Sequence, residues 1–255
     1  MKVSVLFTPA DFSALAAQSL DDSVCVVFDI LRATTSIVSA LDQGAEAILP
    51  VREIDEALAV RAADPSVLLA GERDGLRIGR SITGGVEFDL GNSPREFTAS
   101  RVRGRHIAIT TTNGTRALQA CRHARCVLAS SFLNLSATAR RIPTLGASRV
   151  LLVCSGTHEN AAYEDALAAG ALSSLLARHH GALDHDDSAP MARGLFDAAS
   201  TNLAEALAAS QNGRRLLRIP ELAADVAYCS QVDSIGSVVM ADGDGWLRNL
   251  PVSVS

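Results

Sequence analysis

Residues 24–35 read VCVVFDILRATT, and they set the pattern for most of the chain. The first five are apolar without alternation, which is typical of a strand that is covered on both faces. A polar turn follows, then residues 34–43 have helical periodicity, and a second apolar run comes at 47–50. A strand, a helix and a strand in succession predict a right-handed crossover between parallel strands.

The same alternation recurs along the chain and predicts an α/β fold with a mostly parallel sheet and flanking helices. At 255 residues the chain is long enough to bury a large core as a single unit, 1–255. Residues 24–50 and 106–129 share a weak similarity, because each reads as a strand, a threonine-rich turn, a helix and a strand. This similarity suggests two similar lobes at about 1–130 and 131–255. The expected strands are 3–7, 24–28, 47–50, 67–70, 106–110, 126–129 and 150–154, and the expected helices are 34–43, 53–63, 113–122, 133–141 and 163–179.

The C-terminal part is less regular. The segment 180–192 is polar, and histidines and aspartates are concentrated in and beside it. Nothing in their spacing fixes a ligand geometry, so a solvated connecting loop is favoured over a metal site. Helices are expected at 192–210 and 221–229. A hairpin with strands at 237–241 and 246–250 is expected to follow, around a turn rich in Asp and Gly.

The composition narrows the choice of function. The net charge of −5 argues against a broad nucleic-acid interface, which needs a basic face. Lys2 is the only lysine, which removes a Walker phosphate loop and a Schiff base. The five cysteines lack CxxC spacing, so we expect a reducing, cytoplasmic setting and no cysteine zinc site. No apolar run is long enough for a membrane helix, and arginine remains available to grip a small anion.

Polar residues gather just after four of the predicted strands. In open α/β sheets ligands bind beyond the carboxyl ends of the strands, so these residues are candidates for one site. The candidates are Asp29 and Arg32, then Glu72 and Arg73, then Thr111, Thr112, Asn113, Gly114 and Thr115, and finally Ser155 with Glu164 and Asp165. Acids, arginines, hydroxyls and helix starts in one place favour binding of a phosphorylated anion.

Several of these residues also have a structural explanation. The hydroxyls and the amide of 111–115 are common helix N-caps, and helix N-termini also suit a phosphate, so both interpretations stay open. Asp29 is harder to explain in this way, because an acid beside a buried strand needs a partner. That partner is either Arg32 or a metal ion.

The long segment 71–97 lacks clear periodicity, which in a compact domain usually indicates a functional loop. Its end matches a capping box, because SPRE at 93–96 places proline at the first helical position. Familiar signatures are missing from the chain: there is no Cys-x5-Arg loop, no Gly-x-Ser-x-Gly elbow and no Gly-x-Gly-x-x-Gly loop. Spacing alone therefore indicates an α/β enzyme that binds an anion and no more.

Taken together, the ordered blocks resemble the ComB family, the 2-phosphosulfolactate phosphatases of the coenzyme M route. The blocks are residues 28–35, 71–73, 88–94 and 110–115, and Glu164-Asp165 with Ala169-Gly170. The resemblance extends to Asp225 and to SQVD at 230–233, so it covers nearly the whole chain. It implies a magnesium-dependent hydrolase that releases phosphate from a three-carbon acid bearing a sulfonate, in a fold peculiar to this family. The polar segment 180–192 departs from the family pattern and is interpreted as a variable insertion.

The resemblance and the strand-end clusters lead to the hypothesis of a metal-assisted, in-line displacement at phosphorus. Asp29, with Glu164 or Asp165, would hold Mg²⁺, which prefers hard oxygen ligands. Arg32 and Arg73 would clamp the phosphate and the acid group of the substrate. Attack by water and attack by an Asp29 carboxylate both stay open.

A general base is expected at Glu72 or Asp89. Two rival functions remain, namely a phosphotransferase or lyase acting on a phosphorylated acid, and a non-catalytic module that binds a phosphoanion. As partners we expect the small phosphorylated acid, neither nucleic acid nor membrane, and a homodimer by default. Further substrate contacts are expected from Asn92, Ser93, Thr111, Thr112, Asn113, Gly114, Thr115 and Ser155.

Overall fold

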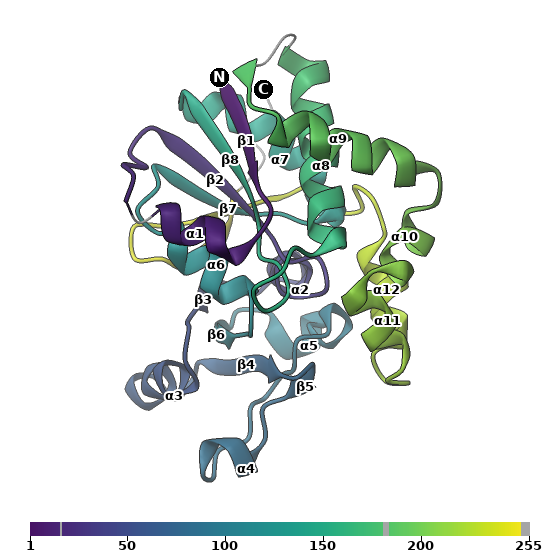
Figure 1. Cartoon of the computed structure of the whole chain (residues 1–255). Helices are drawn as coiled ribbons and strands as arrows, with labels where there is room; N and C mark the ends of the chain where they lie inside the picture. Colours follow the sequence, from purple (N-terminus) through teal and green to yellow (C-terminus); the bar gives the residue numbers. More distant parts are fainter. Residues whose placement is uncertain (16, 181–183, 251–255) are drawn as a thin grey trace.

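The computed structural model describes residues 1–15, 17–180 and 184–250, and in this part of the chain eleven strands form one sheet (Figure 1). The strands are β1 Lys2–Leu6, β2 Ser23–Phe28, β3 Ala47–Pro50, β4 Leu68–Arg73, β5 Leu76–Arg77, β6 His106–Thr110, β7 Cys126–Ala129, β8 Arg149–Cys154, β9 Asp184–His185, β10 Val238–Ala241 and β11 Leu247–Leu250. Their order across the sheet is β5-β4-β6-β3-β11-β10-β7-β2-β8-β1-β9.

The sheet consists of two parallel sets of strands joined by an antiparallel hairpin, and the short edge strand β5 pairs antiparallel with β4. One set is β4, β6 and β3, and the other is β7, β2, β8, β1 and β9. Between them lies the predicted C-terminal hairpin, with β10 paired to β7 and β11 paired to β3. The expected α/β fold with a mostly parallel sheet is confirmed. The strands do not separate near residue 130, because β2 pairs with β8 across that point of the sequence.

Helices cover both faces of β2, which explains its unbroken apolar run. The helices are α1 Pro9–Leu15, α2 Ala33–Asp42, α3 Ile54–Ala63, α4 Arg80–Thr83, α5 Ala99–Val102, α6 Gly114–Ala120, α7 Leu135–Arg141, α8 Tyr163–His180, α9 Ser188–Ala199, α10 Leu203–Ala209, α11 Gln211–Leu217 and α12 Ala223–Cys229. Val24, Val26 and Phe28 share one core with residues of α7 and α8. Cys25 and Val27 share a second core with residues of α2 and α6. Within the described ranges, no helix has the length and apolar character needed to cross a membrane.

The segment 180–192 is exposed at residues 184–187, as its polarity predicts, but its described part is not a loop throughout. It contains the edge strand β9 and the start of α9 (residues 181–183 lie outside the described part). The helix begins at Ser188, whose N–H donates to the Asp186 carboxylate, and Pro190 suits the first turn of a helix. The Ser188 hydroxyl also accepts the N–H of Val5 and so attaches the helix start to β1.

The helix predicted at 192–210 is interrupted, and a further helix follows it. A 3₁₀ turn separates α9 from α10, because Asn202 caps α10 by accepting the N–H of Glu205. Helix α11 was not predicted at all. Its cap is Ser210, whose hydroxyl accepts the N–H of Gly213 at 3.0 Å. Capping by short polar side chains therefore decides this region, where the apolar pattern alone suggests one long helix.

Candidate active site

The carboxyl-end loops of β2, β4, β6 and β8 meet at one pocket, which helix α11 also borders. Six of the residues predicted for the site line this pocket, namely Asp29, Arg32, Glu72, Asn92, Thr112 and Asn113. They come from segments that are far apart in the sequence. The topology of the sheet therefore brings together what the sequence alone presents as separate turns.

Asp29 lies at the end of β2, where the backbone turns into α2. Its Oδ1 accepts the N–H of Ala33 at 3.1 Å, and its own N–H donates to the Thr34 hydroxyl at 3.0 Å. Gly114 at the start of α6 packs directly against it, because a Cβ added there would lie 2.7 Å from Asp29 Oδ2. Glycine is therefore required at residue 114 to let the β6 turn approach the carboxylate.

Glu164 and Asp165 lie in the first turn of α8, where the helix dipole favours negative charge. Both oxygens of Asp165 accept backbone N–H groups, from Ile30 at 2.8 Å and from Gly156 at 3.1 Å. Asp165 thus joins the loop after β2 to the loop after β8. Glu164 Oε1 accepts from the amide of Asn212 at 2.6 Å, whereas Oε2 is buried and has no hydrogen-bond partner among the described residues.

Burial raises the pKa of all three acids, and neighbouring acids raise those of Asp29 and Asp165 further. Burial, with smaller contributions from the charges of Glu72 and Glu164, raises the pKa of Asp29 from 3.8 to about 7. Burial and the charges of Glu164 and Asp29 raise the pKa of Asp165 well above its usual value, and burial raises that of Glu164. Among the ion pairs of the described residues, none includes Asp29, Glu164 or Asp165. When these acids are ionised, no cation of the described chain is paired with them to neutralise their charge.

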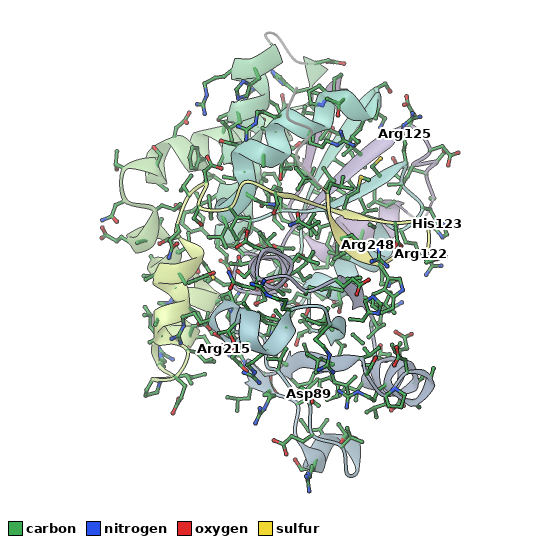
Figure 2. The ribbon with its side chains drawn as sticks, turned by 180° about the vertical axis from the view of Figure 1, so that it is seen from behind. Asp89, Arg122, His123, Arg125, Arg215 and Arg248 are labelled. Atoms are coloured by element: carbon green, nitrogen blue, oxygen red, sulfur yellow. The ribbon has the colours of Figure 1, made fainter. Side chains whose placement is uncertain are left out.

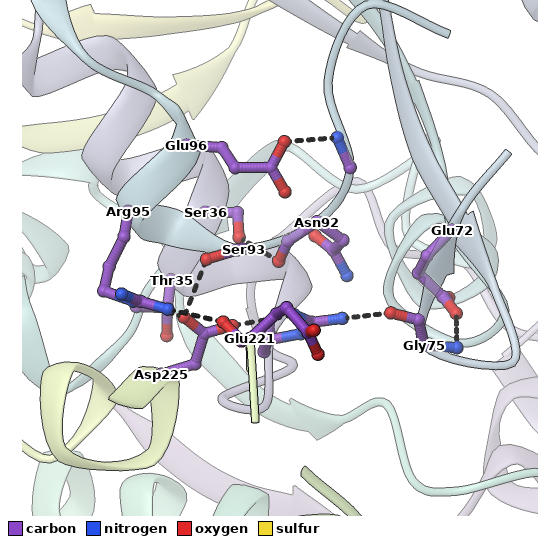
Figure 3. A network of polar contacts seen from close by, with 12 residues as sticks. Thr35, Ser36, Glu72, Gly75, Asn92, Ser93, Arg95, Glu96, Glu221 and Asp225 are labelled. Atoms are coloured by element: carbon purple, nitrogen blue, oxygen red, sulfur yellow. Dashed lines mark hydrogen bonds and ion pairs between the residues drawn. The ribbon is translucent and has the colours of Figure 1, made fainter. Parts of the chain in front are cut away.

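Arg32 is paired with Asp225, which excludes the predicted alternative that it neutralises Asp29. Figure 3 shows Ser93 and Arg95 beside the Asp225 carboxylate. Arg32 Nη1 donates to Asp225 Oδ2 at 2.7 Å, and its Nη2 donates to the Gly75 carbonyl at 2.8 Å. Asp225 Oδ1 accepts from Arg95 at 2.8 Å and from the Ser93 hydroxyl at 2.7 Å. The Asp225 side chain is fully buried, so these three donors fix it and, through it, the guanidinium of Arg32.

The hydroxyl of Ser93 is thus committed to Asp225, and the capping box predicted at 93–96 is wrong. Ser93 makes no side-chain cap bond to the 3₁₀ turn Pro94–Glu96, and Glu96 accepts the N–H of Gly91 instead. Asn92 lines the pocket, and its Oδ1 is buried without a hydrogen-bond partner. The SPRE segment therefore supports the pocket indirectly, because Ser93 and Arg95 hold Asp225, and it forms a 3₁₀ turn in place of a regular helix.

Glu72 joins two of the loops around the pocket. Its Oε1 accepts the N–H and the hydroxyl of Thr112 at 2.9 and 3.0 Å, and its Oε2 accepts the N–H of Gly75 at 2.7 Å. The hydroxyl of Thr115 donates to the Thr111 carbonyl, and the N–H of Thr111 donates to that hydroxyl in turn. The backbone N–H groups of Thr111 and Thr112 are therefore occupied, as is that of Thr115, so they do not form the anion cradle that their pattern suggested.

Nine predicted site residues are not among the described residues that line the pocket, namely Arg73, Asp89, Ser93, Thr111, Gly114, Thr115, Ser155, Glu164 and Asp165. Three of these, Arg73, Asp89 and Ser155, also make none of the contacts described above. The Arg73 guanidinium donates to the Thr110 hydroxyl and to the backbone carbonyls of Glu72 and Arg52, and not to Asp29. Asp89 pairs with Arg61 and accepts the N–H of Leu69. Ser155 is buried at the end of β8, with no hydrogen-bond partner for its hydroxyl. The structure thus separates these three residues from the six that meet at the pocket.

Sequence reasoning missed Asn212 and Arg215 of α11, and it assigned no role to His158, although all three line the pocket. The Asn212 amide donates to the Thr157 hydroxyl at 2.7 Å as well as to Glu164, so it lies over the acids. Arg215 Nη2 is 3.6 Å from Asp74 Oδ1 across the pocket mouth. The Ser-x-x-Gly cap that starts α11 is a local signal that could have found this helix.

The acids fit a magnesium ion held mainly by other oxygens. Among the described residues, no three His, Cys, Asp or Glu side chains gather closely enough to form a complete metal cage. Mg²⁺ does not need one, because it usually keeps several waters and binds one or two carboxylates plus substrate phosphate. Asp29, which lines the pocket, and Glu164, whose Oε2 is buried without a hydrogen-bond partner among the described residues, are the carboxylates that could serve as such ligands.

Comparison with known proteins identifies a family. A family model described as 2-phosphosulpholactate phosphatase matches residues 11–244 of the chain. A protein of Deinococcus radiodurans is 40% identical over 219 residues, covering 83% of this chain and 84% of its own. A protein of Symbiobacterium thermophilum is 36% identical over 221 residues, covering 86% and 91%, and one of Synechococcus is 36% identical over 254 residues, covering 97% and 99%. All three are named "Probable 2-phosphosulfolactate phosphatase".

Proposed function

The chain belongs to the 2-phosphosulfolactate phosphatase family, and we propose that it hydrolyses 2-phosphosulfolactate to 3-sulfolactate and phosphate with Mg²⁺ as cofactor. Membership makes it a phosphoric monoester hydrolase. One observation carries the proposal beyond the family. Three buried acids with no cation of their own lie beside a buried arginine at the carboxyl ends of the strands.

In the proposed reaction water adds to phosphorus and the bond between phosphorus and the ester oxygen breaks. The proton that water loses ends on the oxygen that becomes the hydroxyl of 3-sulfolactate. No acceptor other than water is needed, which separates this reaction from a phosphotransfer. Because little covalent chemistry falls to the protein, its contribution is positioning and neutralisation of charge.

Asp29 and Glu164 are the residues that would hold the ion. When bound, Mg²⁺ neutralises non-bridging phosphate oxygens and makes a coordinated water more acidic. Asp165 does not need to contact the ion, because both of its oxygens already fix the loops that follow β2 and β8. Its role in this proposal is to hold the Asp29 turn in place.

Arg32 would bind the phosphate from the opposite side. Two of its nitrogens are held by Asp225 and by the Gly75 carbonyl, so the guanidinium is fixed before the substrate arrives. A fixed guanidinium stabilises developing negative charge without reorganising during the reaction. The Asn92 and Asn113 side chains line the same pocket and can orient the ester oxygens. Glu72, with three donors on its oxygens, serves to hold the loops together.

The test is release of inorganic phosphate from 2-phosphosulfolactate by the purified protein, with a panel of other three-carbon phospho-acids for comparison. We expect turnover with water as the only acceptor, loss of turnover in EDTA, and recovery on adding Mg²⁺. Turnover that EDTA leaves unchanged would remove the metal from the proposal. Release of phosphate from another panel member at a much higher kcat/KM would reassign the substrate.

A further inference from the structure

The pocket is graded in exposure from its floor to its mouth. Arg32 is 3% exposed, and Asp29 and Glu72 are each 8% exposed, so the phosphate-binding end proposed above is almost closed to water. At the mouth the side chain of Arg215 is 42% exposed and that of Asp74 is 90% exposed. A substrate whose phosphate reaches the floor therefore has its remaining groups near Arg215.

Two arginines line the pocket within the described part of the chain, and only one of them is held by a buried carboxylate. Arg32 is paired with the fully buried Asp225. Arg215 faces only the exposed Asp74, at a distance of 3.6 Å that is too long for a hydrogen bond. Exposed ion pairs of this kind are weak, so the Arg215 guanidinium is free to exchange Asp74 for another anion.

Arg215 extends from α11 towards the β4–β5 region of the sheet (Figure 2). The helix is anchored on its other faces, because Gly213 packs against the Leu207 backbone and Leu216 is buried in the core. Asn212, one residue before Gly213, is bonded to Glu164. The same short helix thus covers the acid cluster and presents a cation at the mouth.

We propose that Arg215 is the residue that recognises the sulfonate of the substrate, taking it in place of Asp74; this inference rests on the proposed function. In 2-phosphosulfolactate the carboxylate is attached directly to the carbon that bears the phosphate. The sulfonate is attached one carbon further away, so it reaches further from a phosphate bound at the floor. A sulfonate keeps its charge at all working pH values, and a guanidinium matches its oxygens with paired N–H donors.

The experiment compares two substrates, 2-phosphosulfolactate and 2-phospholactate, which lacks only the sulfonate, on the wild type and on Arg215→Gln with Mg²⁺ present. For 2-phosphosulfolactate we expect KM to rise about 10-fold to 100-fold with little change in kcat, the range for losing a charge-assisted hydrogen bond made equally in ground and transition states. For 2-phospholactate we expect kcat/KM to stay within about 3-fold, because the lost partner has nothing to bind there.

Arg214→Gln is the matched control. Arg214 is the preceding residue of α11, is exposed, and donates to the Ala209 carbonyl away from the pocket, so both substrates should behave as with the wild type. Asp74→Asn should lower KM for 2-phosphosulfolactate slightly by removing the competing anion.

Equal losses on both substrates in Arg215→Gln, or no loss on either, would overturn the inference while leaving the phosphatase activity in place. A wild type that hydrolyses neither substrate would overturn the proposed function itself.

Discussion

Asp225 and Asp29 are both buried carboxylates beside the pocket, but their surroundings are opposite. Asp225 has three side-chain donors, two of them arginines, and the chain neutralises its charge completely. Asp29 has backbone donors and two further acids near it, and its pKa is raised to about 7. The surroundings of Asp225 fix the guanidinium of Arg32. Among the described residues no cation is paired with Asp29, so its carboxylate is available to a metal ion that the chain itself does not supply. Asp225 therefore has a structural role in the site, whereas Asp29 has the surroundings expected of a metal ligand.

The largest effect should come from Asp29→Asn, which removes the unneutralised charge and keeps the shape. The amide oxygen can still accept the N–H of Ala33, so the protein should fold. We expect kcat to fall about 10²-fold to 10³-fold, the cost of losing one preorganised electrostatic element. Asp89→Asn is the control, because Asp89 follows a strand but lies outside the pocket, and its kcat should stay within about 3-fold. Equal losses in the two variants would show that this pocket is not the active centre.

The next effect is a difference in unfolding free energy between the Asp225→Asn and Asp29→Asn variants. Asp225→Asn leaves Arg32 and Arg95 beside a neutral amide, and removing one partner of a buried pair costs about 3 kcal/mol of unfolding free energy. Asp29→Asn should not destabilise the protein at pH 8, because it removes a charge that burial disfavours. Urea unfolding of both variants measures the difference. A loss of similar size in Asp29→Asn would mean that Asp29 is also a structural acid.

A smaller effect is expected in the pH dependence of stability without metal. Because the pKa of Asp29 is raised from 3.8 to about 7, the folded protein keeps a proton that the unfolded chain releases between these pH values. The stabilisation is complete below the unfolded pKa and is lost as the pH rises through the folded pKa. We expect a loss of about 1.6 kcal/mol between pH 5.5 and 7.0, because the slope of about 1.4 kcal/mol per pH unit falls to half of that at the folded pKa.

The same series of urea titrations in Asp29→Asn gives the contribution of this residue. In the variant the unfolding free energy should fall less steeply with pH than in the wild type. The decrease that remains should come from Glu164 and Asp165, whose pKa values are also raised. Addition of Mg²⁺ should flatten the wild-type curve of unfolding free energy against pH, because a bound cation favours the ionised carboxylate in the folded state. A wild type whose stability rises over this pH range would contradict the assignment.

Much of the fold was predictable from the sequence because the signal is local. The apolar runs of β3, β6 and β7 match the predicted strands to the residue, since buried parallel strands are continuous apolar segments. The insertion of the C-terminal hairpin between β3 and β7 was not predictable, because pairing across the whole chain leaves no local mark. Helix α11 was missed because its cap, Ser210, is also the last residue of the helix predicted at 192–210.

The site was predictable where residues directly follow a strand and unpredictable where a partner comes from elsewhere. Asp29, Glu72 and Asn113 lie at strand ends, so their convergence follows from the fold class. The pairing of Arg32 with Asp225 joins residues 193 positions apart, and nothing near Arg32 in the sequence indicates it. The contrast between Asp225 and Asp29 therefore needed the three-dimensional structure.

Magnesium binding, measured by isothermal titration calorimetry near pH 7 in buffers of different ionisation enthalpy, tests the central claim most directly. The claim is that Asp29 and its neighbouring acids carry charge reserved for a divalent cation. We predict that Mg²⁺ binds the wild type with release of protons, because Asp29 is partly protonated at this pH. Affinity and proton release should both fall sharply in Asp29→Asn and remain in Asp89→Asn. Equal Mg²⁺ affinity in the wild type and Asp29→Asn, with no proton release in either, would contradict the claim.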